Sequence, residues 1–301
     1  MEQVRDKGPA GTAAGSLDQC TDPYLRCAFN GAAQTALGVS RSALLVHSPQ
    51  GCEYLVNNAF ASQECDYMET VTLCTKLCVD EIVHGGEDLL ARTIREAKDL
   101  PISVLFVLSA CGPEIVGDDI VAVCETVQPE VKFRLLPIEC AGFRGSQYDG
   151  IDIALDTMLR KLVRGSGEKV PGSVCLIAPH ANANPTWPAD LAWVRQVLSR
   201  MGVPVVATLA HRTPLSEIEN AASAEASIVL SHDAGQKAAD YLFATYGTEQ
   251  VCRGIPLPIG MTNTQRWLTA LGERFDALET AEEMVSEGER MVMETCRRKW
   301  P

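Results

Sequence analysis

The feature that most constrains this chain is a regular alternation of short candidate strands with longer amphipathic stretches. In the first half the candidate strands are residues 43–46, 68–72, 103–110 and 131–138, and helical patterns such as residues 87–98 separate them. Short apolar runs that end abruptly are typical of strands buried in a parallel sheet. The strand–helix order, repeated four times, predicts an α/β fold with a doubly wound, mostly parallel sheet.

The second half repeats this alternation after a glycine-containing linker at residues 165–172. Its candidate strands are residues 173–178, 203–209, 227–231 and 256–259, and a last helix is predicted over residues 281–298. We therefore expect two consecutive Rossmann-like α/β domains. The predicted divisions are a flexible N-terminal arm at residues 1–19, a first domain at residues 20–166, and a second domain with a C-terminal helix at residues 167–301.

Charge and hydropathy argue against two classes of partner. The net charge of −13 argues against binding to a nucleic-acid backbone. No apolar run approaches the roughly 20 residues of a membrane span. The first 16 residues also lack the apolar core of a signal peptide. We therefore expect a cytoplasmic protein that neither crosses a membrane nor binds nucleic acid.

The chain has twelve cysteines, which is many for a cytoplasmic protein. Disulfides are rare in that compartment, so clustered cysteines indicate metal or redox chemistry. Nine of the twelve lie within the first 140 residues. Any metal or redox chemistry is therefore expected in the first domain.

Cys27, Cys52 and Cys111 are the strongest metal-ligand candidates. Each lies beside glycine or another small residue, and Cys52 and Cys111 follow predicted strands. The carboxyl ends of parallel strands form the edge at which open α/β sheets bind ligands. Thiolates from three separate segments suit an iron–sulfur cluster whose fourth ligand comes from elsewhere. The alternative is that each is a buried cysteine that packs as a small hydrophobic side chain.

Several other groups leave two interpretations open. Arg144, held between two glycines, suits either an anion-binding loop or a structural turn. Asp118 and Asp119 lie early in a helix predicted over residues 114–127. Their charges either interact favourably with the helix dipole or serve acid–base chemistry. Neither half contains a GxGxxG after its first strand, a P-loop, a GxSxG or an HExxH motif. Phosphate-cradle, α/β-hydrolase and zincin functions therefore gain no support.

His180, His211 and His232 each follow a predicted strand of the second half, which indicates either a pocket at that sheet edge or ordinary loop histidines. If their segment is helical, Cys74 and Cys78 share one face of it, as a ligand or redox pair or as core residues. Of the remaining cysteines, Cys124 and Cys175 are predicted to lie in the core and Cys296 at the surface.

Five motifs together resemble the component 1 subunits of nitrogenase and of the nitrogenase-like reductases. They are CAFNGA at residues 27–32, HSPQGC at 47–52, IVHGGEDLLARTI at 82–94, ACGPEIVGDDI at 110–120 and ECAGFRGSQ at 139–147. Their order and approximate spacing are those of the family. The resemblance is strong over residues 20–165 and looser beyond, where PLPIGMTNTQRWL at residues 256–268 carries it.

The resemblance implies a cofactor, partners and a pocket. Cys27, Cys52 and Cys111 would bind an iron–sulfur cluster, either [4Fe–4S] or P-cluster-like, shared with a homologous component 1 subunit in a hetero- or homo-oligomer. The chain would act as an oxidoreductase component that takes electrons from an ATP-dependent iron–sulfur reductase. It would pass them to a substrate in a pocket lined by Arg144, Gln147, His180 and His232.

Three departures from the family narrow this expectation. The nitrogen-reducing subunit has a histidine shortly after its GFRG-type loop, where this chain has Ile151 or Asp152. The family's cysteine ligand of the molybdenum–iron cofactor is replaced here by Ser231 and His232. Family members usually continue into a third α/β domain, which would begin near Pro301. We therefore expect neither dinitrogen reduction nor a molybdenum–iron cofactor.

Three functions stay open from the sequence. The first is a reductase component with a subunit-bridging cluster. The second is a non-catalytic scaffold or assembly factor for a metallocofactor. The third is a cluster-free, truncated α/β binding protein whose cysteines have core roles.

Overall fold

The computed structural model describes residues 26–61, 71–165, 168–179, 186–209 and 212–299. Its first half contains a four-stranded parallel sheet in the order β2-β1-β3-β4. The strands are β1 (Ser42–His47), β2 (Val71–Cys74), β3 (Val104–Ser109) and β4 (Arg134–Glu139). The chain adds β2 on one side of β1 and then β3 and β4 on the other side. The parallel sheet is therefore doubly wound, and this part of the predicted fold is confirmed.

Helices cover both faces of this sheet. They are α2 (Ala28–Leu37), α3 (Gln50–Ala61), α4 (Val79–His84), α5 (Glu87–Glu96), α6 (Cys111–Val116), α7 (Ile120–Val127) and α8 (Gln147–Leu162), with short 3-10 turns η2 (Gln128–Glu130) and η3 (Gly142–Arg144). Alternate strand residues point to opposite faces. Leu45 and Leu105 therefore pack with α5 and α7, whereas Leu44 and Phe106 pack with α2 and α8.

One helix prediction in this half is wrong. Residues 114–127 were predicted as a single helix, but the structure has α6 and α7 there, separated at Gly117. Gly117 has φ +96 and ends α6 in the left-handed conformation that glycine tolerates. Asp119 then begins α7, because its side chain accepts a hydrogen bond from the Ala122 amide at 2.8 Å.

The second half contains another four-stranded parallel sheet, in the order β6-β5-β7-β8. Its strands are β5 (Val170–Ile177), β6 (Val205–Leu209), β7 (Ala224–Val229) and β8 (Glu249–Val251). Its helices are α9 (Trp187–Arg200), α10 (Leu215–Asn220), α11 (Gln236–Tyr246), α12 (Met261–Arg274) and α13 (Leu278–Lys299), with η4 at Ala221–Ser223. The strand predicted at residues 256–259 is wrong, since Pro256 and Pro258 lack amide donors and β8 pairs with β7 instead.

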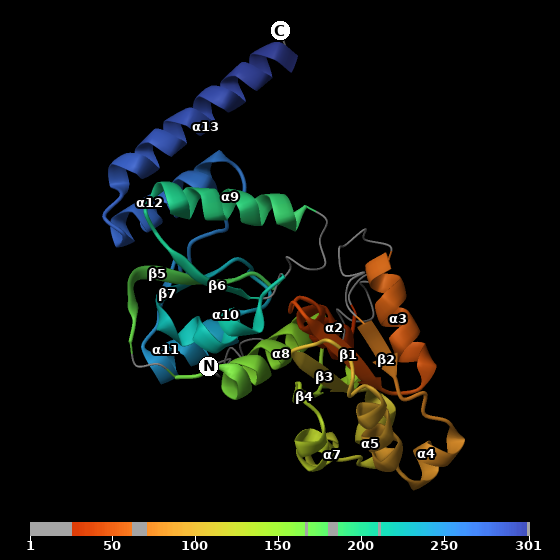
Figure 1. Ribbon diagram of the computed structural model, residues 1–301. Helices are drawn as coiled ribbons and strands as arrows, with labels where there is room; N and C mark the ends of the chain where they lie inside the picture. The colour runs from red at the N-terminus through yellow and green to blue at the C-terminus, as the bar shows by residue number, and fades with distance from the viewer. Residues whose placement is uncertain (1–25, 62–70, 166–167, 180–185, 210–211, 300–301) are drawn as a thin grey trace, which may run out of the picture.

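The helices α2 and α8 lie between the two sheets (Figure 1). One hydrophobic cluster contains Phe106 of β3, Leu155 of α8 and Ile177 of β5, so it continues from one half into the other. Polar contacts add to this packing, because Asp152 of α8 accepts a hydrogen bond from the Gly235 amide at 2.7 Å. None of the helices in the described ranges combines the length and apolarity that a membrane span requires.

The α2–α8 contact is unusually close because glycines lie at the crossing. A Cβ atom on Gly31 of α2 would lie 1.8 Å from the carbonyl oxygen of Gln147. A Cβ atom on Gly150 of α8 would lie 1.8 Å from the carbonyl oxygen of Ala28. No larger residue fits either position without separating the helices.

We expect Gly150→Ala to lower the free energy of unfolding by about 1–3 kcal/mol or more, because the added methyl group forces α2 and α8 apart. Urea unfolding in reducing buffer measures this change. Gly51→Ala is the matched control: Gly51 is also helical, but nothing lies within 4 Å of its Cβ position. That control is expected to be neutral or to stabilise by up to about 1 kcal/mol. Equal losses in both variants would contradict the close crossing.

Candidate functional site

The carboxyl ends of all four strands of the first sheet carry cysteines. Cys74 is the last residue of β2, Cys52 lies in the first turn of α3 after β1, Cys111 begins α6 after β3, and Cys140 directly follows β4. Because the strands are parallel, these ends lie along one edge of the sheet. Sequence reasoning placed Cys52 and Cys111 at this edge, and the structure confirms that placement.

Cys27 reaches the same edge from outside the sheet. It is the N-cap of α2 and pairs in a β-bridge with Ser146, just after η3. The Ala28 amide also donates to the Gly145 carbonyl oxygen at 3.0 Å. The start of α2 is therefore attached to the loop that follows β4.

Cys27 and Cys111 converge on Gly142. The Gly142 amide donates to the Cys111 Sγ at 3.1 Å. A Cβ atom on Gly142 would lie 3.2 Å from the Cys111 Sγ and 3.3 Å from the Cys27 Sγ, so the two sulfurs are at most 6.5 Å apart, the sum of these distances. Gly142 thus leaves open the space beside both sulfurs, and its amide already donates to one of them.

Cys52 lies within electrostatic reach of the same sulfurs. Burial raises the pKa of the Cys52 thiol, and negative charge on Cys111, Cys27 and Cys74, in that order, raises it further. Several thiolates so close together repel one another, and a bound cation removes that cost. Deprotonation of these thiols is therefore favoured when metal binds.

The cysteines of this edge come from separate segments of the chain. Within the described ranges, no three histidine, cysteine, aspartate or glutamate side chains form a group that could hold a single metal ion. A cluster takes its thiolates on different iron atoms, so its ligands are spread further apart. Cys27, Cys52 and Cys111 fit that requirement, because they come from three segments that meet at one edge.

A buried amide lies beside Cys27. Asn30 on α2 donates its Nδ2 to the Cys27 Sγ at 3.8 Å, and its Oδ1 is buried with no hydrogen-bond partner among the described residues. Donors to ligand sulfurs favour the thiolate and tune the potential of an iron–sulfur cluster. Asn30 and the Gly142 amide donate to the sulfurs of Cys27 and Cys111.

Glu114 fixes the loop that carries Gly142. Its carboxylate is only 6% exposed and accepts hydrogen bonds from Ser109, from the Ala141 amide at 2.9 Å and from Arg144 Nε at 2.6 Å. The bond to Glu114 is the main reason that the pKa of the Arg144 guanidinium is raised. Glu114 lies on the helix that Cys111 begins, so Arg144 ties η3 to that helix. No sequence pattern singled out Glu114.

His47 and Asp118 form a second buried polar contact near the carboxyl ends of the strands. His47 Nε2 lies 3.0 Å from Asp118 Oδ2, and His47 Nδ1 lies 3.2 Å from the Thr75 hydroxyl. Asp118 also accepts hydrogen bonds from the Gly86 amide. The network joins the end of β1, the residue after β2 and the turn before α5. Asp118 therefore holds His47 and the Gly86 turn in place, and Asp119 caps α7.

Three of the four predicted pocket residues, Arg144, Gln147 and His232, lie among the described residues, and their surroundings differ. Arg144 is ion-paired with Glu114. Gln147 donates to the Gln34 side chain at 2.7 Å, and Gln34 donates to the Pro179 carbonyl oxygen at 3.0 Å. His232 is exposed after β7 and accepts a hydrogen bond from the Leu257 amide at 3.3 Å. His180 and His211 lie outside the described residues, so the pocket stays a prediction.

The other cysteines divide into core and surface. Cys124 and Cys175 are buried, and burial raises the pKa of each thiol to about 12. Cys296 is exposed. These three predictions are confirmed. The suggestion that Cys74 and Cys78 share a helix face is wrong, because Cys74 ends β2 and Cys78 is the N-cap of α4.

Exposed apolar side chains lie on the short helices and turns that follow the strands of the first sheet. We call this set the apolar rim; it consists of Tyr54 and Leu55 on α3, Val79 and Val83 on α4, Ile115 on α6, and Phe143 on η3. α3 carries Cys52, α6 begins at Cys111, η3 begins at Gly142, and α4 follows Cys78, its N-cap. Apolar side chains gathered on a protein surface mark a site of association with another protein.

The chain matches the protein family described as "Nitrogenase component 1 type Oxidoreductase" over residues 27–299. It is 29% identical over 209 residues to the "Nitrogenase iron-molybdenum cofactor biosynthesis protein NifE" of Clostridium pasteurianum, an alignment that covers 67% of this chain and 44% of that protein. It is 25% identical to the "Nitrogenase vanadium-iron protein beta chain" of Trichormus variabilis, over 82% of this chain and 57% of that protein.

A third relative is the "Nitrogenase molybdenum-iron protein alpha chain" of Methanosarcina barkeri, 26% identical over 87% of this chain and 50% of that protein. The solved structure titled "Nitrogenase Cp1 at pH 6.5" aligns with a TM-score of 0.75 at 22% identity, over 91% of this chain and 55% of that chain. This likeness confirms the fold. The chain spans about half the length of the curated relatives it matches.

We expect stability to depend on pH through His47. Burial holds its pKa below the ordinary 6.5, although Asp118 acts in the opposite direction. The unfolded chain therefore binds a proton near pH 6.5 while the folded chain does not. The free energy of unfolding should consequently fall as the pH drops from about 7 toward 5, by at most about 1.4 kcal/mol per pH unit for this one group.

His47→Gln tests this expectation, because it keeps an amide donor near Asp118 and removes the titrating ring. Denaturant unfolding at several pH values should give a shallower dependence for His47→Gln than for the unmodified chain. The control is His84→Gln, which removes an exposed histidine of α4 in place of the buried one. An unaltered slope in His47→Gln would contradict the assignment.

Proposed function

The chain belongs to the nitrogenase component 1 type oxidoreductase family, and from that premise we propose that it is a cluster-binding electron-transfer component. It accepts electrons from an ATP-dependent iron–sulfur reductase and delivers them to an unidentified substrate other than dinitrogen. The observation that carries the proposal is the meeting of Cys27, Cys52 and Cys111 at one sheet edge, with Gly142 leaving room beside two of the sulfurs.

In this proposal the three thiolates hold an iron–sulfur cluster, either [4Fe–4S] or P-cluster-like. Such a cluster supplies one-electron redox chemistry when it is bound. The Gly142 amide and the Asn30 amide donate to the ligand sulfurs, which favours their thiolate form. Arg144 and Glu114 keep Gly142 against Cys111 by joining η3 to α6.

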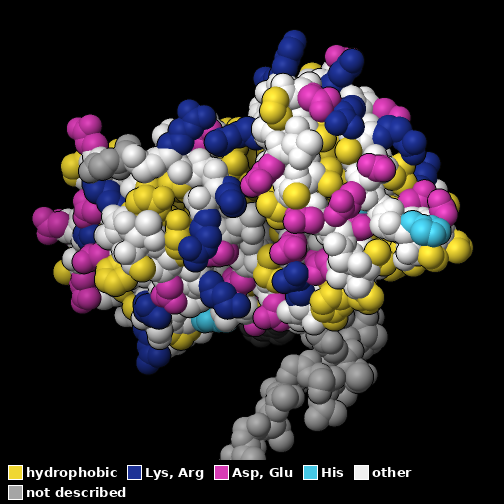
Figure 2. Space-filling view, turned by 90° about the horizontal axis from the view of Figure 1, so that it is seen from below, with side chains coloured by type: hydrophobic (Ala, Val, Ile, Leu, Met, Phe, Trp, Pro, Cys, Tyr) yellow, Lys and Arg dark blue, Asp and Glu magenta, His cyan; other side chains and the backbone are white. Residues whose placement is uncertain are grey.

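The proposed partner at this edge is a homologous component 1 subunit, in a homo- or hetero-oligomer. The apolar rim supports this, because its side chains lie in water in the single chain. A second subunit here would bury the rim and supply the remaining cluster ligands. On the face shown in Figure 2, acidic and basic side chains are interspersed and form no continuous basic band, which fits a protein partner better than a nucleic acid.

Two features support a substrate other than dinitrogen. At the position where the resemblance implies a histidine, Ile151 is buried in the core and Asp152 is held by the Gly235 amide and, at 3.6 Å, by Lys237. At the position of the molybdenum–iron cofactor ligand, Ser231 accepts hydrogen bonds from the amides of the next turn. The first position offers no imidazole and the second no thiolate, so we propose no molybdenum–iron cofactor for this chain.

A second candidate function is assembly of a metallocofactor without turnover. The 29% identity to a protein named for iron-molybdenum cofactor biosynthesis favours it. In that case the chain would bind a cluster or its precursor and would not need a substrate pocket. A third candidate, a cluster-free binding protein, requires the cysteines to have core roles, whereas Cys27, Cys52 and Cys111 are only partly buried.

We expect Cys52→Ala to lose most of the iron and acid-labile sulfide that the unmodified chain contains after anaerobic purification. The EPR signal of the reduced cluster should disappear with them. Cys296→Ser is the matched control, because Cys296 is exposed on α13 far along the chain from the site. Full retention of iron in Cys52→Ala would contradict the assignment of Cys52 as a ligand. Absence of iron from the unmodified chain would favour the cluster-free function.

We also expect the cluster to be reduced by a cognate ATP-dependent iron–sulfur reductase only when MgATP is present. EPR of rapidly frozen mixtures measures this reduction, with ADP in place of ATP as the control. A cluster that stays oxidised with a competent reductase and MgATP would favour the assembly function over electron transfer.

A further inference from the structure

The side chain of Asn30 on α2 contains a polar atom that the surrounding fold leaves unpaired. Asn30 is 8% exposed, and its Oδ1 is buried without a hydrogen-bond partner among the described residues. A buried carbonyl oxygen that gives up its bonds to water and gains none in the protein destabilises the folded state. Asn30 therefore lowers the stability of the chain through this oxygen.

The other polar side chains of α2 have partners. All ten residues of the helix are buried. Gln34 donates to the Pro179 carbonyl oxygen at 3.0 Å. The Thr35 hydroxyl donates to the Gly31 carbonyl oxygen, also at 3.0 Å. Burial in α2 is thus compatible with satisfied hydrogen bonds, and the unpaired oxygen of Asn30 needs its own explanation.

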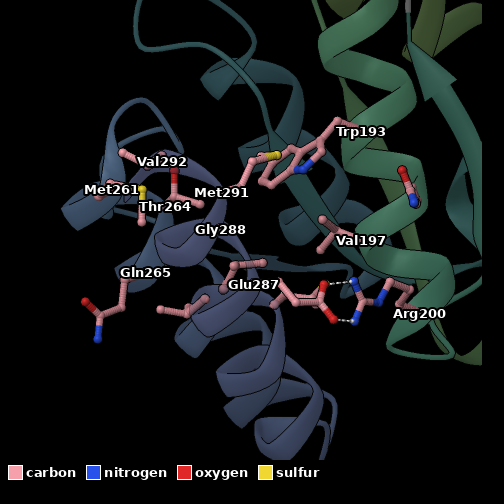
Figure 3. Close-up of a pocket in the computed structure, with 14 residues that line it drawn as sticks. Trp193, Val197, Arg200, Met261, Thr264, Gln265, Glu287, Gly288, Met291 and Val292 are labelled. Atoms are coloured by element: carbon pink, nitrogen blue, oxygen red, sulfur yellow. Dashed lines mark hydrogen bonds and ion pairs between the residues drawn. The ribbon is translucent and has the colours of Figure 1, made fainter. Parts of the chain in front are cut away.

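Polar groups beside other apolar surfaces of the molecule are also paired. Figure 3 shows an apolar groove of about 340 Å³ between α9, α12 and α13, lined by Trp193 and Met261 among others. Arg200 and Glu287 lie at this groove and form an ion pair at 2.7 Å. Within the described ranges, the Ser227 hydroxyl is the other buried side-chain atom that lacks a partner, besides Asn30 Oδ1.

The opposite end of the Asn30 amide lies at the cysteine edge. Cys27 is the N-cap of α2 and Asn30 follows three residues later, so the two side chains share one side of the first helical turn. Asn30 Nδ2 donates to the Cys27 Sγ at 3.8 Å. The positive end of the amide dipole is therefore directed at the sulfur of a proposed cluster ligand, while its negative end is buried without a compensating donor.

We propose that Asn30 is a positioning residue that raises the reduction potential of the cluster through the Cys27 sulfur. The inference rests on the proposed function, because it requires Cys27 to be a cluster ligand. An added electron increases the negative charge on the cluster and on its ligand sulfurs. An N–H donor stabilises that charge more in the reduced cluster than in the oxidised one. Asn30 therefore makes the cluster easier to reduce, which suits a component that accepts electrons.

The proposal accounts for a residue that costs stability at this position. Leucine has nearly the same shape as asparagine and would leave no polar atom unpaired there. A structural role for Asn30 predicts that leucine destabilises the fold, whereas the proposed role predicts no such loss. Asn30 can be tested by substitution, unlike the donor to the Cys111 sulfur, which is the backbone amide of Gly142.

The first test is urea unfolding of Asn30→Leu in the cluster-free chain, in reducing buffer without iron. The equilibrium constant for unfolding should be equal to or smaller than that of the unmodified chain, because the substitution removes an unpaired oxygen and keeps the volume. A tenfold or larger increase in this constant would show that Asn30 supports the fold and would overturn the proposal.

The second test is the reduction potential of the cluster, measured by EPR at a series of fixed potentials after anaerobic purification. Asn30→Leu and Asn30→Ala should both lower it, so that the ratio of reduced to oxidised cluster at one potential falls at least about threefold. A tenfold fall corresponds to about 59 mV for a one-electron couple. Thr35→Val is the matched control, because Thr35 is buried on the same helix and bonds to a backbone oxygen. It should leave the ratio unchanged.

The outcomes separate this proposal from the proposed function. An unchanged potential in Asn30→Leu, or an equal shift in Thr35→Val, overturns the role of Asn30 and leaves the cluster assignment standing. Loss of iron from both Asn30 variants would make Asn30 a requirement for holding the cluster and would also overturn the proposal. Absence of iron from the unmodified chain overturns the proposed function and this inference together.

Discussion

The contact on which the rest of the structure depends is the crossing of α2 and α8. Glycines at positions 31 and 150 let the two backbones touch, and no side chain fits between them. These helices cover one face of the first sheet and also pack on the second sheet through one continuous cluster. The same crossing sets the position of Cys27, because Cys27 is the N-cap of α2 and lies beside the residue that begins α8.

The cysteine edge combines closely placed thiols with buried polar supports. Thiolates at Cys27, Cys52 and Cys111 destabilise one another unless positive charge lies among them. The supports around them are satisfied without metal: Glu114 and Asp118 accept bonds from backbone amides and from Arg144 and His47. The protein's own hydrogen bonds therefore hold the edge in place, as the proposed cluster site requires.

Much of the fold was predictable because buried strands and half-buried helices leave different patterns of apolar residues in the sequence. Strands such as residues 42–47 and 104–109 are buried along their whole length and appear as continuous apolar runs. The errors fall where a local interaction changes the pattern. Gly117 in the left-handed conformation divides a helix that periodicity joins, and prolines 256 and 258 remove the donors a strand would need. The 74–78 segment was misjudged because spacing alone does not distinguish a helix from a strand end and a cap.

For the site, the sequence by itself placed Cys52 and Cys111 after strands and Cys124 and Cys175 within elements, since that follows from local order along the chain. It also carried the motifs that indicate the family. Only the tertiary structure decided that Cys27 joins Cys111 at Gly142 and that Arg144 pairs with Glu114. These contacts join residues distant in the sequence. Their geometry depends on how helices and strands pack, and no spacing along the chain specifies it.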